Sequence, residues 1–245
     1  SFTPLAAQLL KDEAGINLGG VIGFPSGGVS TTIKMAEAAE LIKMGCNELD
    51  MVINVGLLRS GRFEDVQHDV RSVVEIADGI PIKVILECHH LTDAQIQKGC
   101  EISIIAGADF VKTGTGWTPS GATLEVIGFI TGFVGDAIKV KAAGGIRDLD
   151  TLLKMLDMGV ARFGINQNSA IDIIAECRME IEMARLLCLK AAWYMDQGDA
   201  RAAAPWISQI KVIAPRVSLK VIDEAVQMHG GQGISQDTPL AIAWT

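Results

Sequence analysis

Two lysines and one aspartate stand out as residues that could carry out chemistry together. Lys112 lies in GADFVKTGTGW, residues 107–117, between apolar residues and a loop of small ones; Lys141 lies in IKVKAAGG and Asp50 in ELDMVIN. A poorly hydrated lysine can attack a carbonyl, a second cation lowers the pKa of such an amine, and a carboxylate can transfer protons. The three residues therefore predict a Schiff-base site. In the alternative reading, both lysines extend into solvent and Asp50 caps a helix.

The elements that would position these residues repeat along the first 176 residues. Short apolar segments alternate with helical patterns, which are expected near residues 31–45, 62–77, 92–106, 122–134, 148–158 and 169–176. Near-continuous apolar strands are typical of a parallel sheet that is covered on both faces. This rhythm leaves two main choices, a (β/α) barrel or a doubly wound sheet.

Polar residues at the strand ends favour the barrel. They occur in or just after five different strands, whereas a doubly wound sheet usually gathers its chemistry at one switch point; they are Asp50, Glu87, Lys112, Lys141 and Asn166. Small-residue loops follow the last three strands, where barrels commonly bind phosphate. Only about six βα units can be counted and eight close such a barrel, so we expect an N-terminally incomplete α/β barrel that lacks its first two strands.

The rhythm stops near residue 177, and two long helical patterns follow. The first is expected to present one apolar stripe, formed by Ile181, Ala184, Cys188, Ala191 and Met195. The second, residues 206–228, should be kinked or interrupted at Pro215 and should stop at Gly230 and Gly231. The expected organisation is a barrel domain at residues 1–176 and a helical hairpin at residues 177–245.

Composition restricts the partners. The formal charge of −8 argues against nucleic acid and against an anionic membrane, because both require a concentrated basic face. Five cysteines without CxxC spacing suggest neither a disulfide framework nor a zinc site, and the four histidines do not cluster as metal ligands. With no secretory leader or long apolar run, these features predict a cytoplasmic protein that acts on a small molecule. The sequence is compatible with a homo-oligomer but does not decide the oligomeric state.

Several segments resemble one enzyme family. In this order and at these separations, ELDMVIN, GADFVKTGTG and VKAAGGIR are similar to the signature segments of deoxyribose-phosphate aldolase, and VIGFPSG, KVILE and ARFGIN add to the match. The resemblance covers residues 1 to about 176. It implies a TIM-type barrel and a class I lyase without metal or cofactor. The implied reaction is reversible cleavage of 2-deoxy-D-ribose 5-phosphate to D-glyceraldehyde 3-phosphate and acetaldehyde.

The resemblance also assigns residues. It implies that Lys112 is the Schiff-base lysine, Lys141 the partner that lowers its pKa, and Asp50 the proton relay. Further residues fall where the family contacts substrate or phosphate, namely Gly116, Gly144, Gly145, Arg147, Gly164 and Asn166. The chain departs from the family at Asn166 and Gln167, where a serine pair is usual, and at Trp117, where many members have lysine. These departures leave the exact aldehyde substrate open.

The tail is similar to another family. RMEIEMARLLCLKAAWYMD, APWISQIKVIAP and VIDEAVQMHGGQGISQDTPLA resemble part of the C-terminal helical domain of acyl-CoA dehydrogenases. In that family a QxxGGxG segment, here residues 227–233, contacts FAD. A helix pair that ends in glycine explains these residues more simply, so no cofactor is expected. Two alternatives to the aldolase remain: a catalytically impaired fusion or interaction module, and a fragment of a flavin-dependent acyl-CoA dehydrogenase.

Overall fold

The computed structural model describes residues 2–13 and 15–228. The chain divides into two compact units, Ser1–Ile165 and Asn166–Thr245, and each is described by itself. The glycine stop expected at Gly230 and Gly231, and most of the 227–233 segment, lie outside the described residues. The expected end of the aldolase part near residue 176 stays a prediction. Within the described ranges, no helix combines the length and apolar character needed to cross a membrane.

Six parallel strands form the sheet of the first unit, in the order β1 to β6. They are β1 (Gly19–Ile22), β2 (Glu48–Val52), β3 (Ile82–Ile85), β4 (Phe110–Lys112), β5 (Lys139–Ala143) and β6 (Arg162–Gly164). Their order in the sheet follows their order in the sequence, as in a barrel and unlike a doubly wound sheet. The prediction of an incomplete (β/α) barrel with six strands is confirmed.

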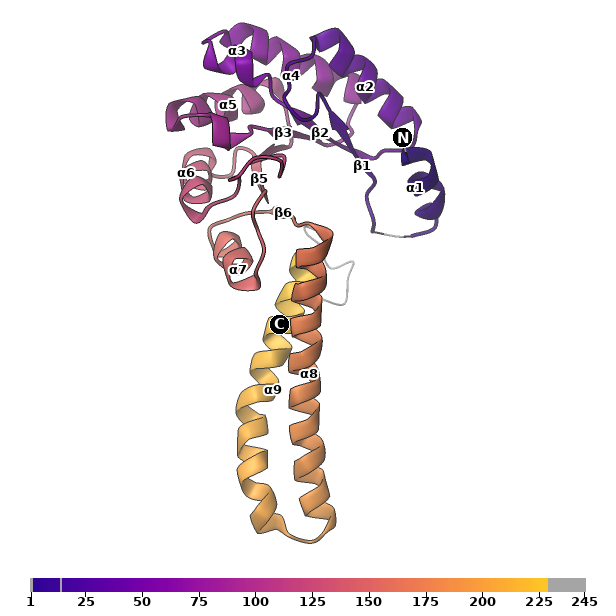
Figure 1. The fold of residues 1–245 in the computed structure, drawn as a ribbon, viewed down its shortest axis with the longest axis vertical. Helices are drawn as coiled ribbons and strands as arrows, with labels where there is room; N and C mark the ends of the chain where they lie inside the picture. The colour runs from indigo at the N-terminus through magenta and orange to yellow at the C-terminus, as the bar shows by residue number, and fades with distance from the viewer. Residues whose placement is uncertain (1, 14, 229–245) are drawn as a thin grey trace. The chain divides into compact units, whose positions relative to one another are not determined.

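Helices lie along the outer side of the sheet, and those after α1, which precedes β1, connect successive strands (Figure 1). They are α1 (Thr3–Leu9), α2 (Thr31–Lys43), α3 (Val55–Arg59), α4 (Phe63–Ala77), α5 (Asp93–Ala106), α6 (Leu124–Val134) and α7 (Leu149–Asp157), with a 3-10 turn, η1, at Cys88–His90. Alternate strand residues such as Leu49, Met51 and Val84 are fully buried in the apolar core. The other alternate set, which includes Glu48 and Asp50, must point toward the opposite, inner face.

Local sequence explains where the helices begin and end. Thr92 starts α5 with a capping box, because its hydroxyl accepts from the Gln95 backbone while the Gln95 side chain accepts from the Thr92 N–H. Gly107 ends the same helix in the left-handed conformation, at φ 85°. Ser30 is the N-cap residue of α2, although Thr31 and Thr32 would also suit a cap by residue type, and the Thr31 hydroxyl donates to Asp69.

The second unit contains α8 (Gln167–Asp196) and α9 (Ala200–Met228), which pack against each other (Figure 1). The prediction of a separate short helix at residues 169–176 is wrong, because α8 is continuous through this stretch. The sequence of α8 contains no glycine or proline that would end the helix there. Gly198, in the left-handed conformation with φ 75°, lies in the turn between α8 and α9. Pro215 lies inside α9 rather than interrupting it.

The apolar stripe expected on α8 is only partly correct. Ala191 is buried, but Ile181, Cys188 and Met195 are exposed. The half-buried and buried positions recur at Ala184, Leu187, Ala191 and Tyr194, which gives the three- and four-residue spacing of one helix face. The predicted stripe therefore included residues from the neighbouring, solvent-facing side of the helix.

Candidate active site

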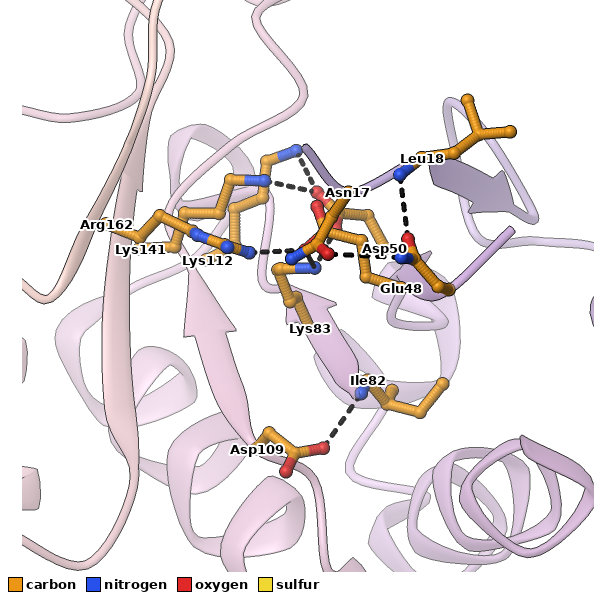
Figure 2. A network of polar contacts seen from close by, with 11 residues as sticks. Asn17, Leu18, Glu48, Asp50, Ile82, Lys83, Asp109, Lys112, Lys141 and Arg162 are labelled. Atoms are coloured by element: carbon orange, nitrogen blue, oxygen red, sulfur yellow. Dashed lines mark hydrogen bonds and ion pairs between the residues drawn. The ribbon is translucent and has the colours of Figure 1, made fainter. Parts of the chain in front are cut away.

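The amines of Lys112 and Lys141 meet at a single carboxylate oxygen. Lys112 Nζ lies 2.7 Å from Asp50 Oδ2, and Lys141 Nζ lies 2.8 Å from the same atom (Figure 2). The side chains of the two lysines are 11% and 12% exposed, and that of Asp50 is 8% exposed. The structure thus contradicts the alternatives in which the lysines extend into solvent and Asp50 caps a helix.

The curvature of the sheet makes this meeting possible. Asp50 is on β2 and Lys141 on β5, so β3 and β4 lie between them in the sheet. Three strand steps of about 4.8 Å each would separate the strands by about 14 Å in a flat sheet, farther than the two side chains reach together. The sheet therefore curls, and its inner face brings the strands' polar residues together.

Register places the two lysines side by side on this inner face. Lys112 pairs with Lys141 in the β4–β5 ladder, and Lys141 pairs with Arg162 in the β5–β6 ladder. Lys112 is also the last residue of β4, and the Thr113–Thr118 loop follows it directly. That loop follows the carboxyl end of the strand, where barrel active sites are built.

A second group of charges joins the three predicted residues. Lys83 on β3 lies 3.1 Å from Asp50 Oδ1 and 3.2 Å from Glu48 Oε2, and the guanidinium of Arg162 on β6 bonds Glu48 Oε2 as well (Figure 2). Sequence reasoning missed Glu48, Lys83 and Arg162 as members of the site. The signal was the two-residue spacing of Glu48 and Asp50, which puts both on the same face of a strand.

Neighbouring charges shift the ionisation of these groups. Burial by itself raises the pKa of Asp50, but the ammonium groups of Lys112, Lys141 and Lys83 outweigh burial and hold that pKa well below its usual range. Burial lowers the pKa of Lys141; Asp50 opposes this effect and the Lys112 charge adds to it. The site therefore holds an ionised carboxylate beside an amine that gives up its proton more readily than an ordinary lysine.

Glu87 fixes the loop that follows Lys112. Its carboxylate accepts hydrogen bonds from the Thr115 hydroxyl at 2.5 Å and from the Thr118 hydroxyl at 3.1 Å, while its own backbone has φ 44°. The Thr115 hydroxyl oxygen in turn accepts from the Trp117 N–H at 3.1 Å. Sequence analysis used Glu87 only as an indicator of a barrel, and its loop contacts were not foreseen.

Two of the predicted phosphate-loop glycines lie close together. A Cβ atom built on Gly144 would be 3.5 Å from the Cα atom of Gly116, and both residues have positive φ, 91° and 85°. Gly145 has φ 94° with open space around it, whereas a Cβ on Gly164 would lie only 2.8 Å from that of Ala143. The loops after β4 and β5 thus approach each other through backbone. Their role in phosphate binding stays a prediction.

The remaining predicted substrate contacts are Arg147 and Asn166. Arg147 is exposed at the start of the segment that leads into α7. Asn166 belongs to the second unit, where its side chain accepts from the Ser169 N–H and caps α8. In the described part of the chain, no three His, Cys, Asp or Glu side chains are grouped to hold a metal ion.

Two family models match parts of the chain. The model described as "DeoC/LacD family aldolase" matches residues 3–171, and that described as "Acyl-CoA dehydrogenase, C-terminal domain" matches residues 160–245. Deoxyribose-phosphate aldolase of Rhizobium meliloti (strain 1021) is 49% identical over 177 residues, which cover 72% of this chain and 71% of that protein.

Solved structures agree with the sequence match. An aldolase named QR15 has a TM-score of 0.69 at 37% identity, covering 74% of this chain and 80% of its own. A deoxyribose phosphate aldolase from Aeropyrum pernix, described as a unique tetrameric structure, has a TM-score of 0.64 at 30% identity, covering 71% of this chain and 73% of its own. With 69% of its length in the first family model's range, this chain belongs to the DeoC/LacD family of aldolases and is a lyase.

Proposed function

We propose that this chain cleaves 2-deoxy-D-ribose 5-phosphate to D-glyceraldehyde 3-phosphate and acetaldehyde, reversibly, through a Schiff base on Lys112. The observation that carries the proposal is the convergence of Lys112 and Lys141 on one oxygen of Asp50. The family match and the curated deoxyribose-phosphate aldolases support the substrate. The geometry supports the chemistry, because a nucleophile, a second amine and a proton carrier lie within hydrogen-bond reach.

The first step requires a neutral amine at Lys112. With both amines protonated, two positive charges face the single negative charge of Asp50, so the group as a whole favours loss of one proton. Lys112 Nζ and Lys141 Nζ both contact Oδ2, so a proton can pass from Lys112 through Asp50 to Lys141. Lys112 then attacks the substrate aldehyde carbon and forms a carbinolamine, which loses water to give a protonated imine.

Cleavage follows from the imine. The hydroxyl on the carbon two positions from the imine carbon loses its proton, and its oxygen forms the carbonyl of the departing aldehyde. The bond between that carbon and the intervening CH₂ carbon breaks, its electrons form the enamine double bond, and the imine π electrons move to the nitrogen. This step releases D-glyceraldehyde 3-phosphate and leaves an enamine of acetaldehyde on Lys112. Asp50 and Lys141, acting through a water molecule, return a proton to the enamine carbon, and hydrolysis releases acetaldehyde and the free lysine.

The loops after β4, β5 and β6 would receive the phosphate end of the substrate. Gly116, Gly144 and Gly145 have positive φ and no side chain, so the backbone of these loops can approach an anion closely. We assign phosphate binding to these glycines together with Gly164 and Arg147. Trp117, which follows Gly116, adds an aromatic ring rather than a cation at this end.

Trapping with borohydride tests the proposal directly. Incubation of the intact chain with acetaldehyde and sodium borohydride should leave an N-ethyl group on Lys112, located by peptide mass mapping. Lys112→Ala should abolish the adduct and the cleavage of 2-deoxyribose 5-phosphate, whereas Lys34→Met, at a buried lysine that contacts Asp69, should keep the adduct. A folded wild-type protein without an adduct at Lys112, or an equal adduct in Lys112→Ala, would overturn the assignment.

We also propose that the protein works as a homo-oligomer. The tetrameric structure of the Aeropyrum pernix relative supports this proposal. Size-exclusion chromatography with light scattering would measure the mass in solution. A monomeric mass over the concentration range of the activity assay would contradict it.

A further inference from the structure

Lys83 is a buried cation for which the Schiff-base mechanism provides no role. Its side chain is 0% exposed, and its ammonium group faces Asp50 Oδ1 at 3.1 Å and Glu48 Oε2 at 3.2 Å. Within the described chain, neither Lys83 Nζ nor Asp50 Oδ1 has a partner with hydrogen-bond geometry. The contact is therefore ionic rather than a completed hydrogen bond.

Lys34 shows what a structural buried lysine looks like in the same protein. It is also 0% exposed, but its ammonium donates to the Val52 carbonyl at 2.9 Å and to Asp69 Oδ2 at 2.5 Å. The other Asp69 oxygen accepts from Thr31, so both Asp69 oxygens and two donors of the Lys34 ammonium are hydrogen-bonded. Replacing a buried ion pair with apolar residues often costs no stability, so an incompletely bonded Lys83 is poorly explained by stability alone.

The position of Lys83 relates it to the reacting groups. The two oxygens of Asp50 are divided: Oδ2 faces Lys112 and Lys141, while Oδ1 faces Lys83. Glu48 holds Lys83 from the other side and is itself bound by Arg162 (Figure 2). A continuous row of alternating charges therefore runs from Arg162 through Glu48 and Lys83 to Asp50.

We propose that Lys83 and Glu48 are positioning residues for the aldolase reaction: they orient Asp50 so that one oxygen serves both reactive lysines, and they set the local charge under which those lysines give up a proton. This inference rests on the proposed function. The row holds four cations, Lys83, Lys112, Lys141 and Arg162, against two carboxylates. Lys83 adds to this positive surplus, and Glu48 limits it.

The groups that face Lys83 and the lysine pair come from several strands. Glu48 and Asp50 lie on β2, Lys112 on β4, Lys141 on β5 and Arg162 on β6, and the Asn17 amide also donates to Glu48 at 3.4 Å. The Phe110 ring lies 5.9 Å from Lys83 Nζ, and Lys139 also faces this ring. The positive charge of Lys83 contributes to lowering the pKa of both Asp50 and Lys141.

Two substitutions should move the pH dependence in opposite directions. Lys83→Met keeps the side-chain bulk and removes a positive charge, so deprotonation of the lysine pair should require a higher pH. Glu48→Gln removes a negative charge, so deprotonation should occur at a lower pH. The measurement is the rate of borohydride-trappable imine formation with acetaldehyde, taken across pH. The rate should rise with pH as the lysine pair loses a proton. We expect the midpoint of this rise to move up by about one pH unit in Lys83→Met and down by a smaller amount in Glu48→Gln.

Controls separate this proposal from a purely structural role. Lys34→Met removes a buried lysine outside the row and should leave the midpoint of the pH–rate profile unchanged, whatever its effect on thermal stability. Circular dichroism will show which variants fold; if Lys83→Met does not, the direction of the Glu48→Gln shift decides. If wild type forms the adduct at Lys112 but the folded variants show the same pH midpoint as wild type, the positioning role is overturned. No wild-type adduct overturns the underlying aldolase assignment instead.

Discussion

Asp50 Oδ2 lies 2.8 Å from Lys141 Nζ although the two residues are 91 positions apart and two strands separate them in the sheet. This contact requires both the inward orientation of each side chain and the curvature of the sheet. Asp50 is thereby held ionised between Lys112 and Lys141, the position from which the proposed mechanism passes a proton between the two amines.

Replacing Asp50 by asparagine should therefore impair chemistry severely. Asparagine keeps the size of the side chain but neither carries a negative charge nor accepts a proton, so kcat for 2-deoxyribose 5-phosphate cleavage should fall by about 10²–10⁴-fold. Asp109→Asn is the matched control, because Asp109 accepts from the Ile82 N–H outside the charged row (Figure 2). Similar losses of kcat in both variants would contradict a specific role for Asp50.

The same carboxylate should make stability depend on pH. The pKa of Asp50 is lower in the folded protein than the ordinary value of about 3.9, so its stabilising contribution is present above that value and is lost as the pH falls through the folded-state pKa. Urea unfolding of wild type and Asp50→Asn between pH 7 and pH 3 would measure this effect. The difference in unfolding free energy should narrow toward low pH. A difference that is constant or grows would contradict the linkage.

The three predicted site residues could be found from the sequence because each is a charged residue within an apolar strand segment. Lys112, Lys141 and Asp50 each lie in an apolar segment, and parallel strands of one sheet bring such residues to one face whatever the connecting helices are. The glycine-containing loops were recognisable for the same reason, since they follow strand ends directly. Strand location was thus enough to predict that these three side chains lie together.

Other features depend on tertiary contacts that the sequence does not display. Lys83 contacts both Glu48 and Asp50, whereas Arg162 joins the site through Glu48, a pairing that requires β2 and β6 to face each other across the curled sheet. Ser30, rather than Thr31, is the N-cap of α2, and Thr31 bonds Asp69, 38 residues away. Local patterns could not distinguish these arrangements from a solvent-exposed lysine or a threonine cap.

The buried pair of Lys34 and Asp69 should behave as a unit. Asp69→Ala leaves the Lys34 ammonium buried without its counter-charge, and burial already lowers the pKa of Lys34, so we expect a loss of about 3–5 kcal/mol in unfolding free energy. Lys34→Met in the same chain should recover most of this loss, because no uncompensated charge remains. Urea unfolding of both single variants and the double variant gives the coupling, and simple additivity would contradict it.

The two neighbouring glycines after β5 offer a matched pair of variants that tests the proposed role of these loops in phosphate binding. Alanine at Gly144 or at Gly145 meets similar backbone strain, at φ 91° and 94°. Only at Gly144 would the added Cβ approach the Gly116 and Gly121 backbone, at 3.5 and 3.3 Å from their Cα atoms. Gly144→Ala should therefore raise KM for 2-deoxyribose 5-phosphate several-fold more than Gly145→Ala. Equal KM values, with equal melting temperatures, would show that the approach of these loops does not affect substrate binding.

Trp117 provides a test of substrate recognition at the phosphate end. Its ring is 75% exposed and contacts Phe24 edge-on at a centroid distance of 5.3 Å, directly after Gly116. Trp117→Lys places a cation in this loop, and an exposed ion pair of about 0.5–1 kcal/mol should lower KM for 2-deoxyribose 5-phosphate two- to fivefold. Trp117→Met removes the ring without adding charge and is the control. The gain should disappear at high salt and with unphosphorylated 2-deoxyribose; a gain shared by Trp117→Met would instead assign the effect to loss of the ring.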